Sequence, residues 1–279
     1  EIDYRIFQKD EWNEEELKKI EEYSKQDIVL LKKIHEFMEE YFKSFKILIS
    51  ENDIREKCYI KDKIGVLAYR ALCYNCNLPF KFSDLKNEQS FRGGLFTEPT
   101  IEEYRSNGND RGIILDVKSA YNHAHRMLNL FSPVSEDFKG KIFSGNHLFP
   151  IKGRYNAEEQ GIIEKKLTEW FKKRLQLLEV NNDSQWAYKT ILNVIFGISS
   201  NPAFESIYLK HTPEDTTLFC EKIIILIKEE FEKEGYKWLY TATDSNYFID
   251  PYKSNEKILE ILGRVKKIIF DNVPFPQDT

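Results

Sequence analysis

The stretch "YTATDSNYFID", residues 240–250, decides the fold. Two apolar, β-rich runs flank a polar tip made of Thr243, Asp244 and Ser245, a pattern typical of a β-hairpin. We therefore expect a strand, a tight reversal and a second strand over 236–250. An aspartate at such a tip has an ordinary explanation as a turn former, so its meaning depends on what surrounds it.

A second carboxylate ends another apolar run. The segment "GIILDVKSAY" (112–121) is continuously apolar up to Asp116 and predicts a buried strand. The chain then turns at Ser119, so backbone N–H groups lie beside the carboxylate and can hold phosphate oxygens. Two carboxylates at the ends of neighbouring strands suit a hard cation such as Mg²⁺.

The sequence pattern predicts that the rest of the chain is mostly helical. Glutamate, lysine and periodic apolar residues predict long helices, and the polar "NNDS" (181–184) predicts a turn between two of them. Because strands are few and irregularly spaced, the order favours an α+β fold over a doubly wound sheet. The expected helices cover 14–49, the region around 64–73, 158–179, 183–196 and 215–234.

The two helices of the expected hairpin carry a set of basic and polar residues. Lys172, Lys173 and Arg174 lie on one arm, and Lys189 and Asn193 lie four residues apart, on one face of the other. Arg174 and Lys189 directed at one groove would bind a polyphosphate. The alternative is a solvated surface with mixed charges.

Composition limits the class of protein. The chain has 279 residues, of which 41% are hydrophobic, so a folded core is expected. No apolar run approaches the ~20 residues of a membrane helix and no signal-peptide pattern is present, so we expect an intracellular protein, neither secreted nor associated with membranes. The net charge of −5 does not indicate a nucleic-acid binder, although a local basic groove is compatible with it.

Cysteine usage and the first residues add two expectations. The four cysteines do not form a disulfide pattern, and the Cys73-x-x-Cys76 pair lacks a second pair at zinc-ligand spacing, so ordinary thiols in a reducing compartment are favoured over half a zinc site. The chain opens at Glu1 without a methionine, inside what reads as a helix. We therefore expect a fragment of a longer protein.

Five short segments together resemble the motifs of family B DNA polymerases, in the order of that family. The segment "DVKSAY" (116–121) resembles the first palm motif, "KTILNVIFG" (189–197) the fingers motif and "YTATDS" (240–245) the second palm motif. Upstream, "FRGG" (91–94) with "EP" (98–99) is similar to the element that links exonuclease and polymerase parts. The segment "YSKQD" (23–27) resembles the third exonuclease motif.

The resemblance implies an architecture for the whole chain. The palm would be an antiparallel sheet with helices on one face, and a helical hairpin inserted into it would form the fingers. An N-terminal helical remnant of a 3′–5′ exonuclease domain would carry Tyr23 and Asp27, without the motifs needed for proofreading. The implied boundaries are 1–50 for the remnant, 51–99 for a connector, 100–148 and 197–279 for the palm, and 149–196 for the fingers.

The resemblance also implies roles for single residues. Asp116 and Asp244 would bind two Mg²⁺ ions, with Mn²⁺ able to substitute and the Val117 carbonyl as a further ligand. Tyr121 would exclude a ribose 2′-hydroxyl from the dNTP. The implied dNTP pocket consists of Ser119, Ala120, Tyr121, Arg174, Lys189, Asn193 and Gly197.

Several positions depart from the family pattern. Ala242 replaces the first of two usual acids in the second palm motif, which predicts weakened but not abolished metal binding because Asp116 and Asp244 remain. Val194 and Phe196 replace a serine and a tyrosine in the fingers motif. Leu178 stands where a second base is usual, and Asn122 where a proline usually follows the tyrosine.

The expected function is therefore template-directed DNA synthesis from a primer 3′ end. The expected partners are primer–template DNA and dNTPs, together with further polymerase segments or chains and a processivity factor. The main alternative is a catalytically impaired polymerase-like module that serves as a nucleic-acid-binding or scaffold subunit. A metal-dependent nuclease built on Asp116 and Asp244 is a third alternative, but it leaves Tyr121 and Lys189 without a role.

Overall fold

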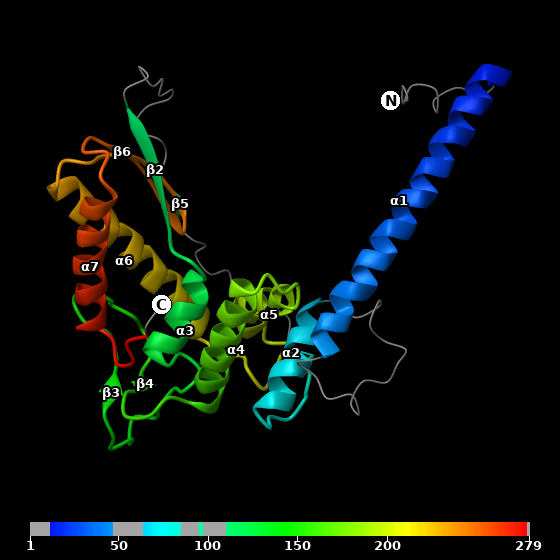
Figure 1. Ribbon diagram of the computed structural model, residues 1–279. Coiled ribbons are helices and arrows are strands. Elements are labelled where there is room, and N and C mark those ends of the chain that lie inside the picture. Colours follow the sequence, from blue (N-terminus) through cyan, green and yellow to red (C-terminus); the bar gives the residue numbers. More distant parts are fainter. Residues whose placement is uncertain (1–11, 47–63, 85–94, 97–109, 278–279) are drawn as a thin grey trace. The chain divides into compact units, whose positions relative to one another are not determined.

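The computed structural model describes residues 12–46, 64–84, 95–96 and 110–277 (Figure 1). The chain divides into two compact units, Glu1–Tyr59 and Ile60–Thr279. The expected linking element at 91–94 and 98–99 and the cysteine at position 58 lie outside the described residues. The mixture of helices and small antiparallel sheets confirms the predicted α+β class.

The first unit is built on one long helix, α1 (Glu14–Lys46). It begins with a capping box, in which the Glu16 backbone N–H donates to the Asn13 side chain (2.9 Å) and the Asn13 N–H donates to the Glu16 carboxylate (3.1 Å). Pairs such as Glu15 with Lys19 support its exposed surface. Tyr23 and Asp27, the expected exonuclease-like pair, are half-buried on this helix and share one face.

The second unit contains a four-stranded antiparallel sheet. Its strand order is β1-β5-β6-β2, and the predicted hairpin forms its centre because β5 and β6 pair with each other. The remaining strands pair at its two sides, β1 with β5 and β2 with β6. The strands are β1 (Leu95–Phe96), β2 (Arg111–Asp116), β5 (Lys237–Thr243) and β6 (Ser245–Asp250).

Three helices form the core beneath this sheet. Helix α6 (Thr212–Lys233) packs against β5 and β6, and both α3 (Ala120–Leu128) and α7 (Asn255–Phe270) pack against α6 (Figure 1). The Asn246 side chain of β6 fixes this packing, because it donates to the Ile224 carbonyl of α6 (2.8 Å). Phe248 of β6 is fully buried and stacks on Phe231 of α6.

The prediction that the apolar run up to Asp116 forms a buried strand was wrong in one respect. Strand β2 alternates between half-buried and exposed positions, and Ile114 is 62% exposed, because only one face of the strand packs on the core. The strand ends at Asp116, as predicted, and α3 follows after a short turn. The apolar run therefore forms one half-buried strand.

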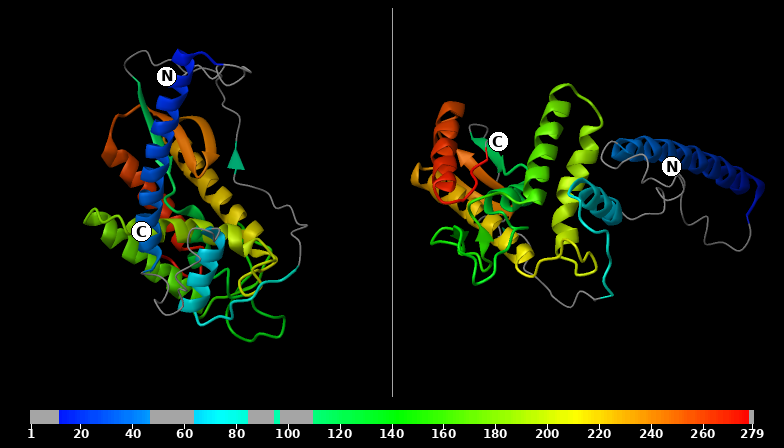
Figure 2. Two further views of the ribbon diagram at one scale, coloured as in Figure 1. Left: turned by 90° about the vertical axis from the view of Figure 1, so that its right-hand side faces the viewer. Right: turned by 90° about the horizontal axis from the view of Figure 1, so that it is seen from below.

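The predicted helical hairpin is present (Figure 2). It consists of α4 (Ile162–Glu179) and α5 (Gln185–Ser199), which pack side by side, and α2 (Ile64–Asn75) packs on α5. Helix α4 begins four residues later than predicted, because the Gly161 N–H donates to the Asn129 side chain (2.9 Å) while the Gln160 side chain donates to the Arg126 carbonyl (3.0 Å). These bonds hold the segment before the helix in a non-helical conformation.

Residues expected in the fingers also contribute to the core of the sheet unit. A two-stranded ribbon, β3 (Ile142–Phe143) with β4 (Tyr155–Asn156), crosses the predicted boundary. Tyr155 is buried in the cluster that holds α3, α6 and α7. Its hydroxyl donates to the Asp215 carboxylate of α6 (2.7 Å), which ties the ribbon to that helix.

Two smaller expectations concern membranes and thiols. Among the helices that the structure describes, none is long and apolar enough to cross a membrane. Cys73 and Cys76 are free and buried, and their thiols lie near the carbonyl oxygens of Pro79 and Ile162. Burial raises the pKa of Cys73 to about 11 and that of Cys76 to about 12, so both thiols are unreactive at neutral pH.

Candidate functional site

Strand pairing brings Asp116 and Asp244 together. Asp116 is the last residue of β2 and pairs with Ser245, the first residue of β6. The Ser245 hydroxyl donates to the Asp116 carboxylate (2.7 Å), and the Val117 N–H donates to the Asp244 carbonyl (2.8 Å). The two aspartates thus occupy the same end of two neighbouring strands.

The turn that carries Asp244 is tight and strained. Thr243 has a φ of 55°, a left-handed conformation that is unfavourable for a β-branched residue. The Asp244 N–H donates to the Ala242 carbonyl across it (2.7 Å), as in a γ-turn. Such a conformation persists only when its surroundings hold it, and the pairing of β5 with β6 does so here.

The surroundings of Asp244 disfavour the charged form of its carboxylate. Partial burial raises the pKa of Asp244, and the neighbouring Asp116 carboxylate raises it further. A divalent cation held by Asp116 and Asp244 would offset this repulsion. Together with backbone carbonyls, water and substrate phosphates, one or two carboxylates are a usual donor set for Mg²⁺. The pair therefore fits the metal expected from the sequence.

Additional protein ligands for such an ion are scarce near this pair. Among the described residues, no group of three or more His, Cys, Asp or Glu side chains is arranged to hold a metal ion. The position of Ala242 explains part of this. Ala242 pairs with Ser245, which pairs with Asp116, so an acid at 242 would lie two strands from Asp116, or about 10 Å across the sheet. The acid missing at 242 is therefore not a direct neighbour of Asp116.

The start of α3 forms the next wall of the site. Ser119 precedes the helix with a left-handed φ of 58°, and its side chain makes no capping hydrogen bond. The first helical bond is donated by His123 to the Ser119 carbonyl (3.1 Å). The N–H groups of 120–122 therefore lie in the first turn, where a helix has free donors and the positive end of its dipole.

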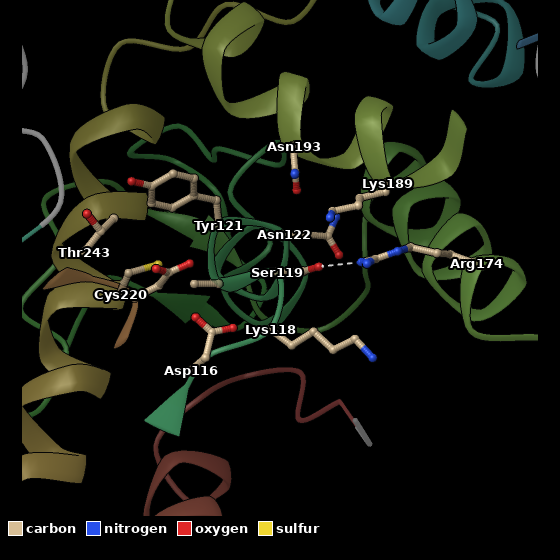
Figure 3. A pocket seen from close by; sticks show the side chains of 12 residues that line it. Asp116, Lys118, Ser119, Tyr121, Asn122, Arg174, Lys189, Asn193, Cys220 and Thr243 are labelled. Carbon is tan, nitrogen blue, oxygen red and sulfur yellow. Dashed lines mark hydrogen bonds between the residues drawn. The ribbon is translucent and has the colours of Figure 1, made fainter. Parts of the chain in front are cut away.

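These elements surround a cavity of about 410 Å³ (Figure 3). It draws side chains from the end of β2, the start of α3, both arms of the helical hairpin, α6 and the turn between β5 and β6. The residues that line it are Asp116, Lys118, Ser119, Ala120, Tyr121, Asn122, Arg174, Lys189, Asn193, Cys220, Thr243 and Asp244.

The hairpin supplies the basic wall. Arg174 of α4 is buried and donates to the Ser119 hydroxyl (3.0 Å), while its Nε atom has no partner. Burial lowers the pKa of Arg174 from its ordinary value, but a guanidinium stays charged at neutral pH. Lys189 of α5 holds its ammonium 4.7 Å from the centre of the Trp186 ring. The two cations of the hairpin therefore line the same cavity as the two carboxylates and Lys118.

Not every residue expected in the site lines this cavity. Val117 contributes only its backbone bond to Asp244, and its side chain packs against the core. Gly197 lies on an exposed part of α5, where a Cβ atom would meet nothing within 4 Å, so the free chain does not itself require glycine there. Tyr23 and Asp27 lie in the other unit.

Four lining residues were not predicted. Lys118 lies inside the motif that starts at Asp116, so its position was a usable signal. Asn122 was noted only as a departure from a family pattern. Cys220 is buried on α6, where nothing in the sequence distinguishes it from a core residue, and Thr243 enters through the geometry of its turn.

Comparison with known proteins supports the fold and no more. No protein-family model matches the chain, and no curated protein matches its sequence. Among solved structures, it is similar to the family B DNA polymerase from the hyperthermophilic archaeon Pyrobaculum calidifontis, with 16% sequence identity and a TM-score of 0.57. The similarity covers 82% of this chain and 31% of that polymerase.

The arrangement of helices and strands is thus that of a polymerase-like fold. At 16% identity the likeness concerns the arrangement of helices and strands, not the activity. This chain spans about a third of the polymerase's length, 31%, so the activity, substrates and partners of the whole polymerase do not transfer directly.

Proposed function

We propose that this chain is the palm and fingers part of a template-directed DNA polymerase, which adds dNTPs to a primer 3′ end. The sheet with α3, α6 and α7 would be the palm, and α4 with α5 the fingers. The observation that carries the proposal is the meeting in one cavity of Asp116, Tyr121, Arg174, Lys189 and Asp244, which come from distant parts of the chain.

The residues present suit phosphoryl transfer, which depends mostly on positioning and charge neutralisation. Arg174 and Lys189 would bind the triphosphate, Arg174 through paired donors and Lys189 as a point charge. The free N–H groups of the first turn of α3 would donate hydrogen bonds to further phosphate oxygens. Tyr121 would lie beside the sugar and exclude a 2′-hydroxyl.

Asp116 and Asp244 would hold the Mg²⁺ ions, with the Val117 carbonyl as a further ligand. Bound there, the ions would activate the primer 3′-hydroxyl and neutralise the charge that develops on the pyrophosphate. The role of the protein is to keep the two carboxylates in place. The Ser245 hydroxyl does so for Asp116.

Position 242 favours a second candidate function, a polymerase-like module that binds nucleic acid without efficient synthesis. An alanine there removes one acid from the second palm motif. The cation-lined cavity argues against this candidate, because a scaffold has no use for a triphosphate site. A measurement of primer extension distinguishes the polymerase from the module that only binds nucleic acid.

Primer extension tests the proposal. The chain would be incubated in low salt with a short primer–template, dNTPs and Mg²⁺ or Mn²⁺, since phosphate contacts weaken steeply with salt. Asp116→Ala and Ala242→Asp would be compared with Asp271→Ala, which removes an exposed carboxylate outside the cavity. We expect extension by the parent chain and by Asp271→Ala, and none by Asp116→Ala.

Binding of the primer–template is measured in parallel by fluorescence anisotropy. If only Ala242→Asp extends the primer, the fold supports synthesis and position 242 suppresses it. If primer–template binds but no form extends it, the proposal is wrong for this chain and the scaffold candidate replaces it. Extension that survives Asp116→Ala would contradict the assigned carboxylates.

A further inference from the structure

Asn122 has a buried side chain without a hydrogen-bond partner. Its exposed fraction is 1%, and among the residues that the structure describes neither the amide nitrogen nor the amide oxygen meets a partner. Buried polar groups in folded proteins are nearly always hydrogen-bonded, because giving up water without a replacement costs free energy. An amide left open in the interior therefore calls for an explanation.

Asn246, another buried asparagine, does have hydrogen-bond partners for its side chain. Asn246 is also fully buried, yet its amide donates to the Ile224 carbonyl (2.8 Å) and accepts from the Thr241 hydroxyl. The backbone carbonyl of Asn122 accepts from Arg126 Nε (3.4 Å), but this bond leaves the side chain unused. Its side chain thus contributes no hydrogen bond within the described part of the chain.

The location of Asn122 indicates what the amide could bind. Asn122 lines the cavity from the first turn of α3, and Figure 3 shows it between Ser119 and Lys189. Its neighbours on that side of the cavity are donors and cations, including Arg174, whereas the carboxylates lie at the strand ends. An amide offers two N–H donors without adding charge. A phosphate oxygen suits such surroundings.

We infer that Asn122 contacts the substrate and that its amide donates to a phosphate group of the bound nucleoside triphosphate. This inference rests on the proposed function and adds a specific residue to it. Asn122 would act with Arg174, Lys189 and the first turn of α3. In the ligand-free chain the open amide lowers stability, and the ligand supplies a partner for its N–H donors.

The inference predicts opposite effects on stability and on binding, which a structural role would not produce. Asn122→Leu keeps the size of the side chain and removes the open amide. We expect it to raise the Tm of the ligand-free chain by about 2–4 °C and to weaken binding of inorganic tripolyphosphate and of dATP by about tenfold or more. Asn246→Leu is the matched control, and it should lower the Tm because its partners would be left open.

Calorimetric titration with tripolyphosphate and with dATP, beside thermal unfolding, separates the outcomes. Unchanged affinity in Asn122→Leu, or a Tm that falls together with affinity, would overturn the role of Asn122 and leave the proposed function standing. Weaker binding of dATP alone would move the contact from the phosphates to the nucleoside and contradict the inference. Failure of the parent chain to bind either probe would reject the triphosphate site itself.

Discussion

The ring of Tyr121 stacks on the ring of Phe196, with centroids 4.3 Å apart and planes inclined by 27°. Tyr121 belongs to α3, beneath the sheet, and Phe196 belongs to α5 of the helical hairpin. The contact therefore joins the two parts of the unit at the cavity wall. The position of the hairpin helix consequently affects where the Tyr121 ring lies.

The stacking predicts that substitutions at the two positions are coupled. Tyr121→Ala and Phe196→Ala should each lower the free energy of unfolding, and the double variant should lose less than the sum by about 0.5–1.5 kcal/mol. Urea unfolding of the four chains measures this coupling. Tyr240 with Tyr247, another stacked pair at 4.1 Å, provides a comparison cycle on the sheet. Strict additivity for Tyr121 and Phe196 would show that the contact contributes nothing.

A second prediction concerns the bond from Ser245 to Asp116. Ser245→Ala removes a donor to a carboxylate, an interaction of about 1.5–3 kcal/mol. We expect a higher Mg²⁺ midpoint in primer extension, because the Asp116 carboxylate loses its orientation. Ser135→Ala is the control, since the Ser135 hydroxyl donates to Asp137 in an exposed pair away from the cavity. Equal midpoints for both variants would contradict a positioning role for Ser245.

A third prediction concerns Glu164, buried at the start of α4. Its carboxylate accepts from the Phe131 N–H (2.6 Å), and burial raises its pKa from 4.5 to about 7. Between these values the folded chain keeps a proton that the unfolded chain has released, so stability falls as the pH rises from about 4.5 to 7 and then levels off. Glu164→Gln should remove this loss, on the order of 2–4 kcal/mol.

The measurement is urea unfolding of the parent and Glu164→Gln chains at pH 5 and pH 8. Burial lowers the pKa of both His123 and His125 to about 3, so these groups make stability rise with pH below about 6.5. Their contribution has the opposite sign and cancels in the difference between the two chains. A difference that stays constant across the pH range would show that Glu164 ionises normally.

A fourth prediction concerns Asp215, which is buried at the start of α6. Its carboxylate accepts from the N–H groups of Lys152 (2.7 Å) and Gly153 (2.8 Å) and from the Tyr155 hydroxyl. Asp215→Asn would turn an amide N–H₂ toward these donors, so we expect a loss of about 3–5 kcal/mol in the free energy of unfolding. The exposed neighbour Glu214, changed to Gln, should cost less than about 1 kcal/mol. Equal losses would contradict this account.

The parts of the fold predicted from the sequence are those with strong local patterns. The hairpin at 240–250 and helices α4, α5 and α6 show periodic apolar residues and clear turn signals, and the structure contains all of them. The pairing of Asp116 with Ser245 agrees with the expectation that two carboxylates lie at the ends of neighbouring strands.

Helix α3 could not be predicted because its burial does not follow an apolar pattern. It buries His123, His125 and Arg126 together with small apolar residues, so no polar face marks it as a helix. Tertiary contacts stabilise the buried polar residues of α3 instead. One example is the Arg126 guanidinium, which lies over the Phe171 ring, 4.4 Å from its centre. The exposure of Ile114 could not be predicted either, since a continuous apolar run does not indicate that one face of the strand is exposed to solvent.

The main chain of Asp244 is held on both sides. Its N–H donates to the Ala242 carbonyl and its carbonyl accepts from the Val117 N–H, so only the side-chain torsions of Asp244 remain free. The conformational entropy of this turn is lost when the chain folds, not when a cation arrives. Capture of a charged ligand at Asp244, as proposed, would therefore require little reorganisation of the backbone, and the strained Thr243 turn would preorganise the site.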